Sequence, residues 1–378
     1  MSNPPTPPTP THRAKSRMSR RGVIGAAGAV AVGAALTPVV FAATEPDTSG
    51  ASGSADTGAT TEQFPATRAQ AADGTGAATA AFPISYVGLR WAGEQDGTAI
   101  KLADGAWQDV TGGCASAAAD DGTLGTALVA AGDVTAYEVK ASSGVTDVRS
   151  LAIDTTDGKK RDCEVPSDPT RVRGVEYLSR AAWGADESKR FKADGTENTP
   201  TAYYPAQVLT VHHTDTVNDD PDPAATVRAI YEYHAITNDW GDIGYHFLID
   251  EAGRIYEGRW SGTDGLPGHD RQGRVVTGFH VAGCNSGNIG IALLGTLVEQ
   301  GPTEAAGAAL VRLAGAMARF HGMDPRARTT YTNPMTGAKR EVTTLQGHRD
   351  WMRTDCPGGT MHGRLPAVRA AAAQRARK

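Results

Sequence analysis

From Val175 to the C-terminus, short apolar runs alternate with longer segments of helical periodicity. Residues 207–211 and 288–294 are almost continuously apolar, as in strands that are covered on both faces. A helix is expected to begin at Asp222-Pro223, because proline in the first turn loses no hydrogen bond. Residues 303–321 place four apolar side chains on one helical stripe: Leu310, Leu313, Met317 and Phe320. Strands alternating with helices predict an α/β domain over residues 175–378, with a mixed central sheet flanked by helices.

Residues 82–166 show another pattern, in which short apolar runs are separated by turn signals. The runs include residues 84–87, 99–102 and 148–153. Asp-Gly pairs, which favour tight turns between strands, stand at positions 96–97, 104–105, 121–122 and 157–158. We therefore expect a small all-β accessory domain before the α/β domain. No cluster of histidines or acids in it suggests catalysis, so a binding or spacer role is expected.

Two segments have the composition of linkers. Residues 44–81 are mostly Ala, Gly, Thr and Ser with few large apolar side chains, which predicts a flexible linker that buries too little surface to order itself. Residues 167–174 contain proline and arginine and are interpreted as a second, shorter linker. Within the α/β domain, residues 329–344 have strand-like ends around Asn333-Pro334, which predicts a surface hairpin.

The first 43 residues resemble an export signal. Basic residues end in Arg20-Arg21, and an apolar run of small residues follows from Val23. Adjacent arginines before a mildly apolar run are typical of a twin-arginine signal, which exports folded proteins. A single membrane anchor is the alternative. Pro38 and the prevalence of Gly and Ala over Leu favour a signal that is cleaved.

Charge and cysteine content narrow the possible partners. The formal net charge is −5, and removal of residues 1–43 would leave −10, because that segment carries five basic residues and no acid. An acidic protein is not suited to nucleic acid, whose binding depends on Lys and Arg, nor to nonspecific attraction by an anionic surface. Among the four cysteines, Cys114 and Cys163 can form a disulfide outside the cytoplasm or stay reduced. Cys284 is interpreted as a small buried apolar residue.

The strongest candidate for chemistry is the glycine-bounded segment 347–359. It carries His348 and Cys356, and imidazole with thiolate suits zinc. His212 stands where a buried strand ends, and His348 follows a second strand-like run. Groups at the carboxyl ends of neighbouring strands meet at one edge of an α/β sheet, so the three side chains converge if these strands are adjacent. Three protein ligands plus water is the pattern of a catalytic zinc. On residue types alone, a structural role for these histidines stays open.

Five motifs, in order, make the domain from Val175 onward resemble the family of peptidoglycan recognition proteins and zinc N-acetylmuramoyl-L-alanine amidases. They are Leu178–Ala185, Val211–Thr214, Trp240–Ile249 with Gly253–Arg259, Asn285–Ile291, and Gly347–Asp350 with Thr354–Gly358. The resemblance covers roughly half of the chain and leaves the predicted β domain outside. The chain departs from animal members at Cys284 and in the inserted hairpin around Asn333, which leaves local groove detail and substrate preference open.

The resemblance implies a role for each matching residue. It implies three zinc ligands: His212, His348 and Cys356. It implies two catalytic groups: Tyr245, facing the metal-bound water or the developing oxyanion, and Thr354, just before the cysteine ligand. It implies two contacts to the muramyl peptide: His280 and Asn285. Non-catalytic receptors of the family lack the cysteine ligand, so the presence of Cys356 favours hydrolysis.

The function that the resemblance implies is zinc-dependent hydrolysis of the amide bond between N-acetylmuramic acid and L-alanine in peptidoglycan. With the export signal, it implies a secreted, cell-wall-associated protein whose partner is peptidoglycan, with no nucleic acid and no membrane anchor after cleavage. We expect a monomer. Two alternatives remain at this point: a protein that binds peptidoglycan without cutting it, and a wall-associated protein whose zinc only stabilises the fold.

Overall fold

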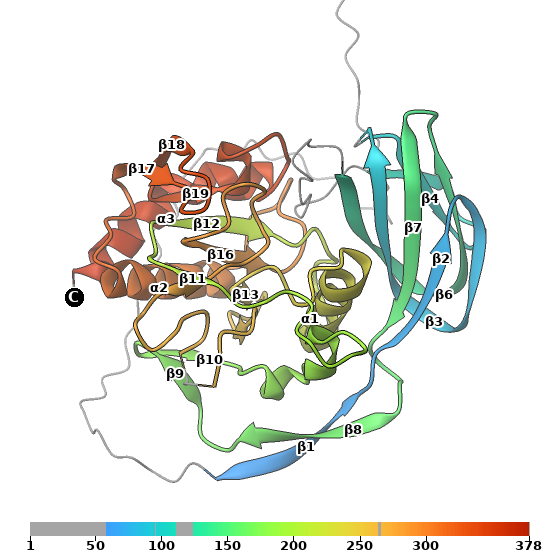
Figure 1. Ribbon diagram of the computed structural model, residues 1–378, viewed down its shortest axis with the longest axis horizontal. Coiled ribbons are helices and arrows are strands. Elements are labelled where there is room, and N and C mark those ends of the chain that lie inside the picture. The colour runs from blue at the N-terminus through green and yellow to red at the C-terminus, as the bar shows by residue number, and fades with distance from the viewer. Residues whose placement is uncertain (1–57, 95, 111–123, 264–265, 378) are drawn as a thin grey trace, which may run out of the picture. The chain divides into compact units, whose positions relative to one another are not determined.

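The computed structural model describes residues 58–94, 96–110, 124–263 and 266–377. The predicted signal peptide, the first part of the predicted linker and Cys114 lie outside these residues. The described part contains two larger sheets, one antiparallel and one mixed (Figure 1). Among its helices, none is both long enough and apolar enough to cross a membrane.

The N-terminal part is all-β, as predicted. Its six-stranded sheet has the order β2-β7-β3-β6-β4-β5, and every neighbouring pair is antiparallel. The strands are β2 (Arg68–Asp73), β3 (Gly76–Gly93), β4 (Thr98–Leu102), β5 (Trp107–Val110), β6 (Leu124–Ala141) and β7 (Val145–Asp154). The long strands β3 and β6 supply most of a separate apolar core that includes Leu89, Trp91 and Val139. The burial of these apolar side chains accounts for the ordering of the region.

The prediction of a flexible linker is wrong over residues 59–81. Strand β1 (Ala59–Pro65) pairs with β8 (Lys160–Pro166), and β2 and the start of β3 follow directly. Most side chains of β1 are exposed, so backbone hydrogen bonds to a distant strand, rather than apolar burial, order this segment. Composition could not reveal that partner. The second predicted linker likewise contains β9 (Thr170–Val172), which forms a hairpin with β10 (Val175–Tyr177).

The C-terminal part has the predicted α/β architecture around a mixed five-stranded sheet of order β14-β13-β16-β12-β19. Its strands are β12 (Val208–His213), β13 (Phe247–Ile249), β14 (Ile255–Glu257), β16 (Asn288–Leu293) and β19 (Leu345–Gly347). Strands β13, β16, β12 and β19 are parallel, and β14 is antiparallel to β13. The parallel register places β12 directly beside β19, so the carboxyl ends that carry His212 and His348 are neighbours.

Helices cover both faces of this sheet. Helices α2 (Glu304–Phe320) and α3 (Gly359–Ala376) pack on one face, where Leu310, Leu313 and Met317 join Val211 and Ile291 in one core. Helix α1 (Pro223–Glu232) packs on the other face with Trp183 and Leu248. Asp222 caps α1 by accepting a hydrogen bond from the Ala225 amide at 3.0 Å, and proline stands at its first turn as predicted.

Shorter elements complete this part of the chain. They are the helical turns η1 (Ala181–Trp183), η2 (Glu187–Arg190), η3 (Tyr233–Thr237) and η4 (His348–Asp350), and the strand pair β11 (Tyr203–Tyr204) and β15 (Val275–Val276). The predicted hairpin is present as β17 (Arg328–Thr332) and β18 (Lys339–Thr343).

Candidate metal centre

His212 is placed by the alternation of side chains along β12. Leu209 and Val211 face the core under α2 and α3, so His212 points to the opposite face of the sheet. His213 points back, where its Nδ1 accepts a hydrogen bond from the Leu297 amide at 3.0 Å. Of the two consecutive histidines, His212 therefore lies in the candidate site, and His213 forms a hydrogen bond with the backbone. His213 is buried as well.

His348 begins a helical turn immediately after β19, and Asp350 fixes this turn. One carboxylate oxygen of Asp350 accepts from the Gly347 amide at 2.9 Å, and the other is 2.9 Å from His362 Nε2. Gly347 permits close packing, because a Cβ there would lie 2.9 Å from the ring of Pro357. The turn brings His348 beside His212, with 4.6 Å between their ring centroids.

Cys356 reaches the same place through the loop that follows η4. The Arg349 amide donates to the carbonyl of Cys356 at 2.9 Å, which closes the loop. Its Sγ lies 3.5 Å from Nδ1 of His212. One ligand atom from each of His212, His348 and Cys356 lies within 4.8 Å of the others. The three residues that residue types and resemblance singled out are therefore brought together.

A chain of hydrogen bonds sets the protonation of His212. Nε2 of His280 lies 3.0 Å from the carbonyl oxygen of Asn288, which can only accept, so His280 carries its proton on Nε2. Burial lowers the pKa of His280 to about 3, so its Nδ1 has a lone pair at neutral pH. That Nδ1 lies 3.0 Å from Nε2 of His212 and must accept from it. His212 therefore holds its proton on Nε2 and turns an unprotonated Nδ1 towards Cys356.

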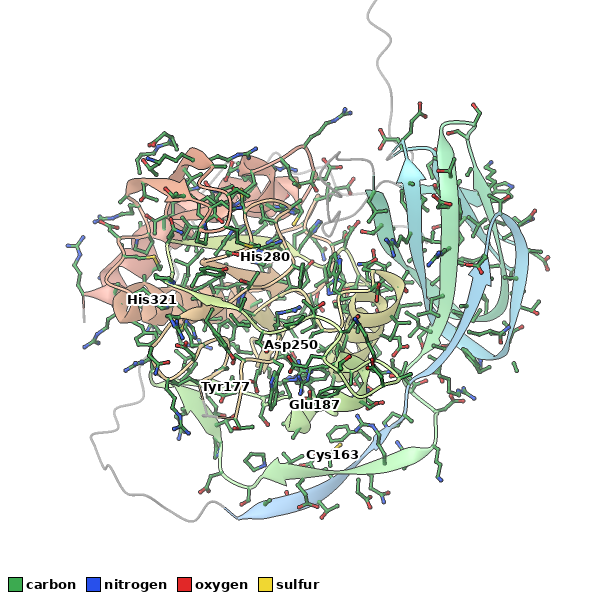
Figure 2. All side chains as sticks on the ribbon, in the orientation of Figure 1. Cys163, Tyr177, Glu187, Asp250, His280 and His321 are labelled. Carbon is green, nitrogen blue, oxygen red and sulfur yellow. The ribbon has the colours of Figure 1, made fainter. Side chains whose placement is uncertain are left out.

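The ring of His280, which Figure 2 labels, has room because a glycine stands beside it on β16. A Cβ at Gly290 would lie 2.7–2.8 Å from three ring atoms of His280. The motif Asn288–Ile291 thus provides both the carbonyl that His280 binds and the space for its ring. His280 is only 2% exposed, and both its ring nitrogens have protein partners. In this structure its role is therefore to orient His212. Its contact with a muramyl peptide stays a prediction.

The electrostatics of the site favour neutral imidazoles. Burial lowers the pKa of His348 to about 3, with His213 adding to the effect, and burial also holds the pKa of His212 well below its usual range. Neutral imidazole is the form that binds metals. Neither ring nitrogen of His348 has a hydrogen-bond partner among the described residues, although the side chain is buried. An orphaned buried imidazole beside a cysteine and a second histidine fits a zinc ligand set.

Tyr245 lies beside these residues, just before β13. Its ring centroid is 5.1 Å from that of His212 and 5.4 Å from that of His234. His234 supports the segment, because its Nδ1 accepts from the Gly244 amide at 3.1 Å. Strand β13 begins only at Phe247, so Tyr245 and His246 belong to the loop that leads into it. Tyr245 is thus positioned next to a candidate ligand.

Thr354 and Asn285, the two other predicted site residues, form local backbone bonds. Thr354 Oγ1 accepts from the Cys356 amide at 3.2 Å, which shapes the loop before the cysteine. Asn285 Oδ1 accepts from the amides of His280 and Val281 at 2.8 and 2.7 Å, which holds the turn that carries His280. A catalytic role for Thr354 and a substrate contact for Asn285 stay predictions.

Sequence reasoning did not single out a buried charge network that supports the approach to Tyr245. Arg180 donates through Nε to Glu187 at 2.7 Å and through Nη1 to Asp242 at 3.0 Å. Asp242 in turn accepts from the amides of Ile243 and Trp260 at 2.7 and 2.8 Å. The sequence offered one indication of this network, since Arg180 and Asp242 each lie inside a motif of the resemblance. Their pairing across 62 residues could not be predicted from the sequence.

Comparisons with known proteins agree with this picture. The family model described as N-acetylmuramoyl-L-alanine amidase matches residues 202–359, which include all three candidate ligands. Human N-acetylmuramoyl-L-alanine amidase is 34% identical over 161 residues, which cover 42% of this chain and 23% of the human protein. Peptidoglycan-recognition protein SC2 of Drosophila melanogaster is 31% identical over 195 residues, which cover 50% of this chain and 83% of that protein.

The matches are partial in two respects. The chain spans about a quarter of the length of the human amidase that it matches. Among solved structures, wild-type Drosophila PGRP-LB is 26% identical, covers 51% of this chain and 94% of that chain, and has a TM-score of 0.37. The sequence relatives, and not this structural match, show to which family the chain belongs.

Proposed function

Because the chain belongs to the family of N-acetylmuramoyl-L-alanine amidases and peptidoglycan recognition proteins, we propose that it is a zinc-dependent hydrolase of peptidoglycan. The bond cleaved is the amide between N-acetylmuramic acid and L-alanine. The observation that carries the proposal is the convergence of His212, His348 and Cys356 with ligand atoms within 4.8 Å of one another. The proposed site of action, in line with the predicted export signal, is the cell wall outside the cytoplasmic membrane.

In the proposed mechanism, the chain's own residues hold the metal and manage charge and protons. His212, His348 and Cys356 hold the zinc, which when bound polarises the amide carbonyl and lowers the pKa of a water molecule. His280 keeps His212 Nδ1 unprotonated for this task. Tyr245 donates a hydrogen bond to the oxygen on which negative charge develops, a contribution of about 3–4 kcal/mol for a well-placed donor. Tyr245 or Thr354 then relays the proton lost by the attacking water to the leaving nitrogen of L-alanine, whose bond to the carbonyl carbon breaks.

A peptidoglycan-binding protein that does not cut is the second candidate. The burial of the ligand set favours it, because His212, His348 and Cys356 are each no more than 1% exposed and a substrate must reach the metal. Cys356 and the neighbouring Tyr245 favour hydrolysis. The two functions differ in a directly measurable product.

Chelation tests the proposed function. Purified peptidoglycan incubated with the zinc-loaded protein is expected to release stem peptides with a free L-alanine amino terminus, identified by mass spectrometry. EDTA treatment should stop the release, and added zinc should restore it, because water activation depends on the metal. Release that continues after the metal is gone contradicts the zinc assignment. Sedimentation of the protein with peptidoglycan but without release, in the zinc-loaded state, supports the binding protein instead.

Replacing His280 with leucine is expected to weaken zinc binding by about 10–100-fold, since the partners that orient a metal-binding histidine typically contribute that much. Leucine has a similar volume but no acceptor for His212 Nε2–H. His280→Gln keeps a hydrogen-bonding group and should lose less affinity. Competition with a chromophoric chelator measures both constants. Equal zinc affinity of His280→Leu and the unchanged protein would mean that His280 does not orient His212.

A further inference from the structure

Away from the candidate metal centre, four arginines surround a hollow of about 640 Å3. They come from three elements: Arg173 from the turn between β9 and β10, Arg312 and Arg319 from α2, and Arg375 from the end of α3. Phe320 forms part of the wall, and the guanidinium carbon of Arg173 lies 3.7 Å from its ring centroid. None of the residues that line the hollow is acidic.

These arginines lack the counter-charges that other arginines of the chain have. Arg180, Arg254 and Arg274 each lie within 3.0 Å of a carboxylate oxygen. None of the four arginines around the hollow forms an ion pair within the described part of the chain. Burial lowers the pKa of Arg312, and the neighbouring Arg375 lowers it further, as expected for like charges held together. This concentration of positive charge is local, because the whole chain has a net charge of −5.

Local backbone requirements account for only part of the cluster. Arg319 and Arg375 stand in the last turns of their helices, where a cation interacts favourably with the helix dipole. Arg312 is in the middle of α2, and Arg173 stands at φ 52°, a conformation that favours glycine, asparagine or aspartate. Gly315 lets α3 approach, because a Cβ there would lie 2.8 Å from Cβ of Arg375. The backbone conformation of Arg173 and the close approach of α3 to α2 at Gly315 together bring the four guanidinium groups around the hollow.

We propose that this hollow is a binding site for a polyvalent phosphate, such as a phosphodiester chain or a phosphate ester. A single carboxylate would leave most of the four positive charges uncompensated, whereas several phosphoryl groups would neutralise them. Guanidinium forks match phosphate oxygens in geometry and donate paired hydrogen bonds. The volume falls in the range of small-ligand sites, roughly 300–1,000 Å3. The site is separate from the metal centre and does not depend on the proposed hydrolysis.

Titration calorimetry with a soluble poly(glycerol phosphate) chain tests this site in the zinc-loaded full chain. The double variant Arg312→Ala/Arg319→Ala is expected to bind at least about 10-fold more weakly, because it loses two guanidinium groups that donate charge-assisted hydrogen bonds to phosphate. The matched control is Arg326→Ala, an exposed arginine paired with Asp324 outside the hollow, which should stay within 2-fold. Binding should weaken as salt rises. Far-UV circular dichroism and thermal melts report that both variants fold.

Two further arms identify the ligand. Phosphatidylglycerol vesicles replace the soluble chain to distinguish a lipid headgroup from a soluble or wall-linked phosphate; arginine-dependent binding in either arm supports the site and names the source. Polyglutamate of similar length tests whether the site prefers phosphate to carboxylate. An affinity for polyglutamate equal to that for poly(glycerol phosphate) would overturn the phosphate assignment. Equal affinity of the double variant and the unchanged protein in both phosphate arms would overturn the site. If Arg319→Ala impairs folding at the end of α2, Arg312→Gln alone carries the same comparison.

Discussion

Replacing Cys356 with serine is expected to abolish amide hydrolysis while leaving the protein folded. Serine keeps the size of the side chain, but its hydroxyl is far less acidic than a thiol and does not supply the anionic sulfur ligand that zinc prefers. Losing the several kcal/mol that a metal ion contributes to the transition state corresponds to a fall of at least about 1,000-fold in kcat/KM. Release of stem peptides and zinc content per chain are the two measurements.

Cys284→Ser provides a matched control, because Cys284 is also a buried free cysteine but lies in an apolar cluster with Val208 and Tyr331. It should keep zinc and lose little activity. A protein with Cys356→Ser that still sediments with peptidoglycan would separate recognition from cleavage. Equimolar zinc and an unchanged rate in Cys356→Ser would contradict the assignment of this residue as a ligand.

The convergence of the three candidate metal ligands was predictable because it depends on strand ends. A histidine after a buried run and a second histidine after another run meet when the strands are parallel neighbours, and β12 and β19 are such a pair. The Gly347–Gly359 segment then needs only to fold back to deliver Cys356. These relations are local in sequence, apart from one strand pairing. Residue types and spacing therefore favoured the convergence, and the family resemblance supplied the ligand set.

The role of His280 was less accessible, because sequence does not say which way a ring in a glycine-rich loop turns. The decisive facts are an acceptor carbonyl at Asn288 and the missing Cβ at Gly290, both on the adjacent strand. The ordering of residues 59–81 had a similar cause. Strand β1 is stabilised by pairing with β8, about one hundred residues away, and the composition of β1 alone does not predict this pairing.

Replacing Arg180 with methionine is expected to be the most destabilising change in the charge network, costing about 3–5 kcal/mol. Methionine fills the space of the stem but removes the guanidinium that pairs at 3.0 Å with Asp242, whose side chain is only 5% exposed. The carbonyl of Gly258 also loses its donor. Differential scanning calorimetry should show the Tm of the C-terminal part falling by roughly 6–20 °C. Arg326→Met, in a pair whose two members are each almost half exposed, should leave Tm close to that of the unchanged protein.

Arg180→Lys separates charge from geometry in the same network. Lysine keeps a cation near Asp242 but cannot donate at once to Glu187, Asp242 and the Gly258 carbonyl as the guanidinium does. Its cost should fall between those of the unchanged protein and Arg180→Met. Asp242 begins the segment that ends at Tyr245, so both variants should also lower kcat at temperatures where they remain folded, with zinc content unchanged. If Arg180→Met lowers Tm but leaves kcat intact, the network supports the fold alone and Tyr245 is positioned by its packing against His234 and His212.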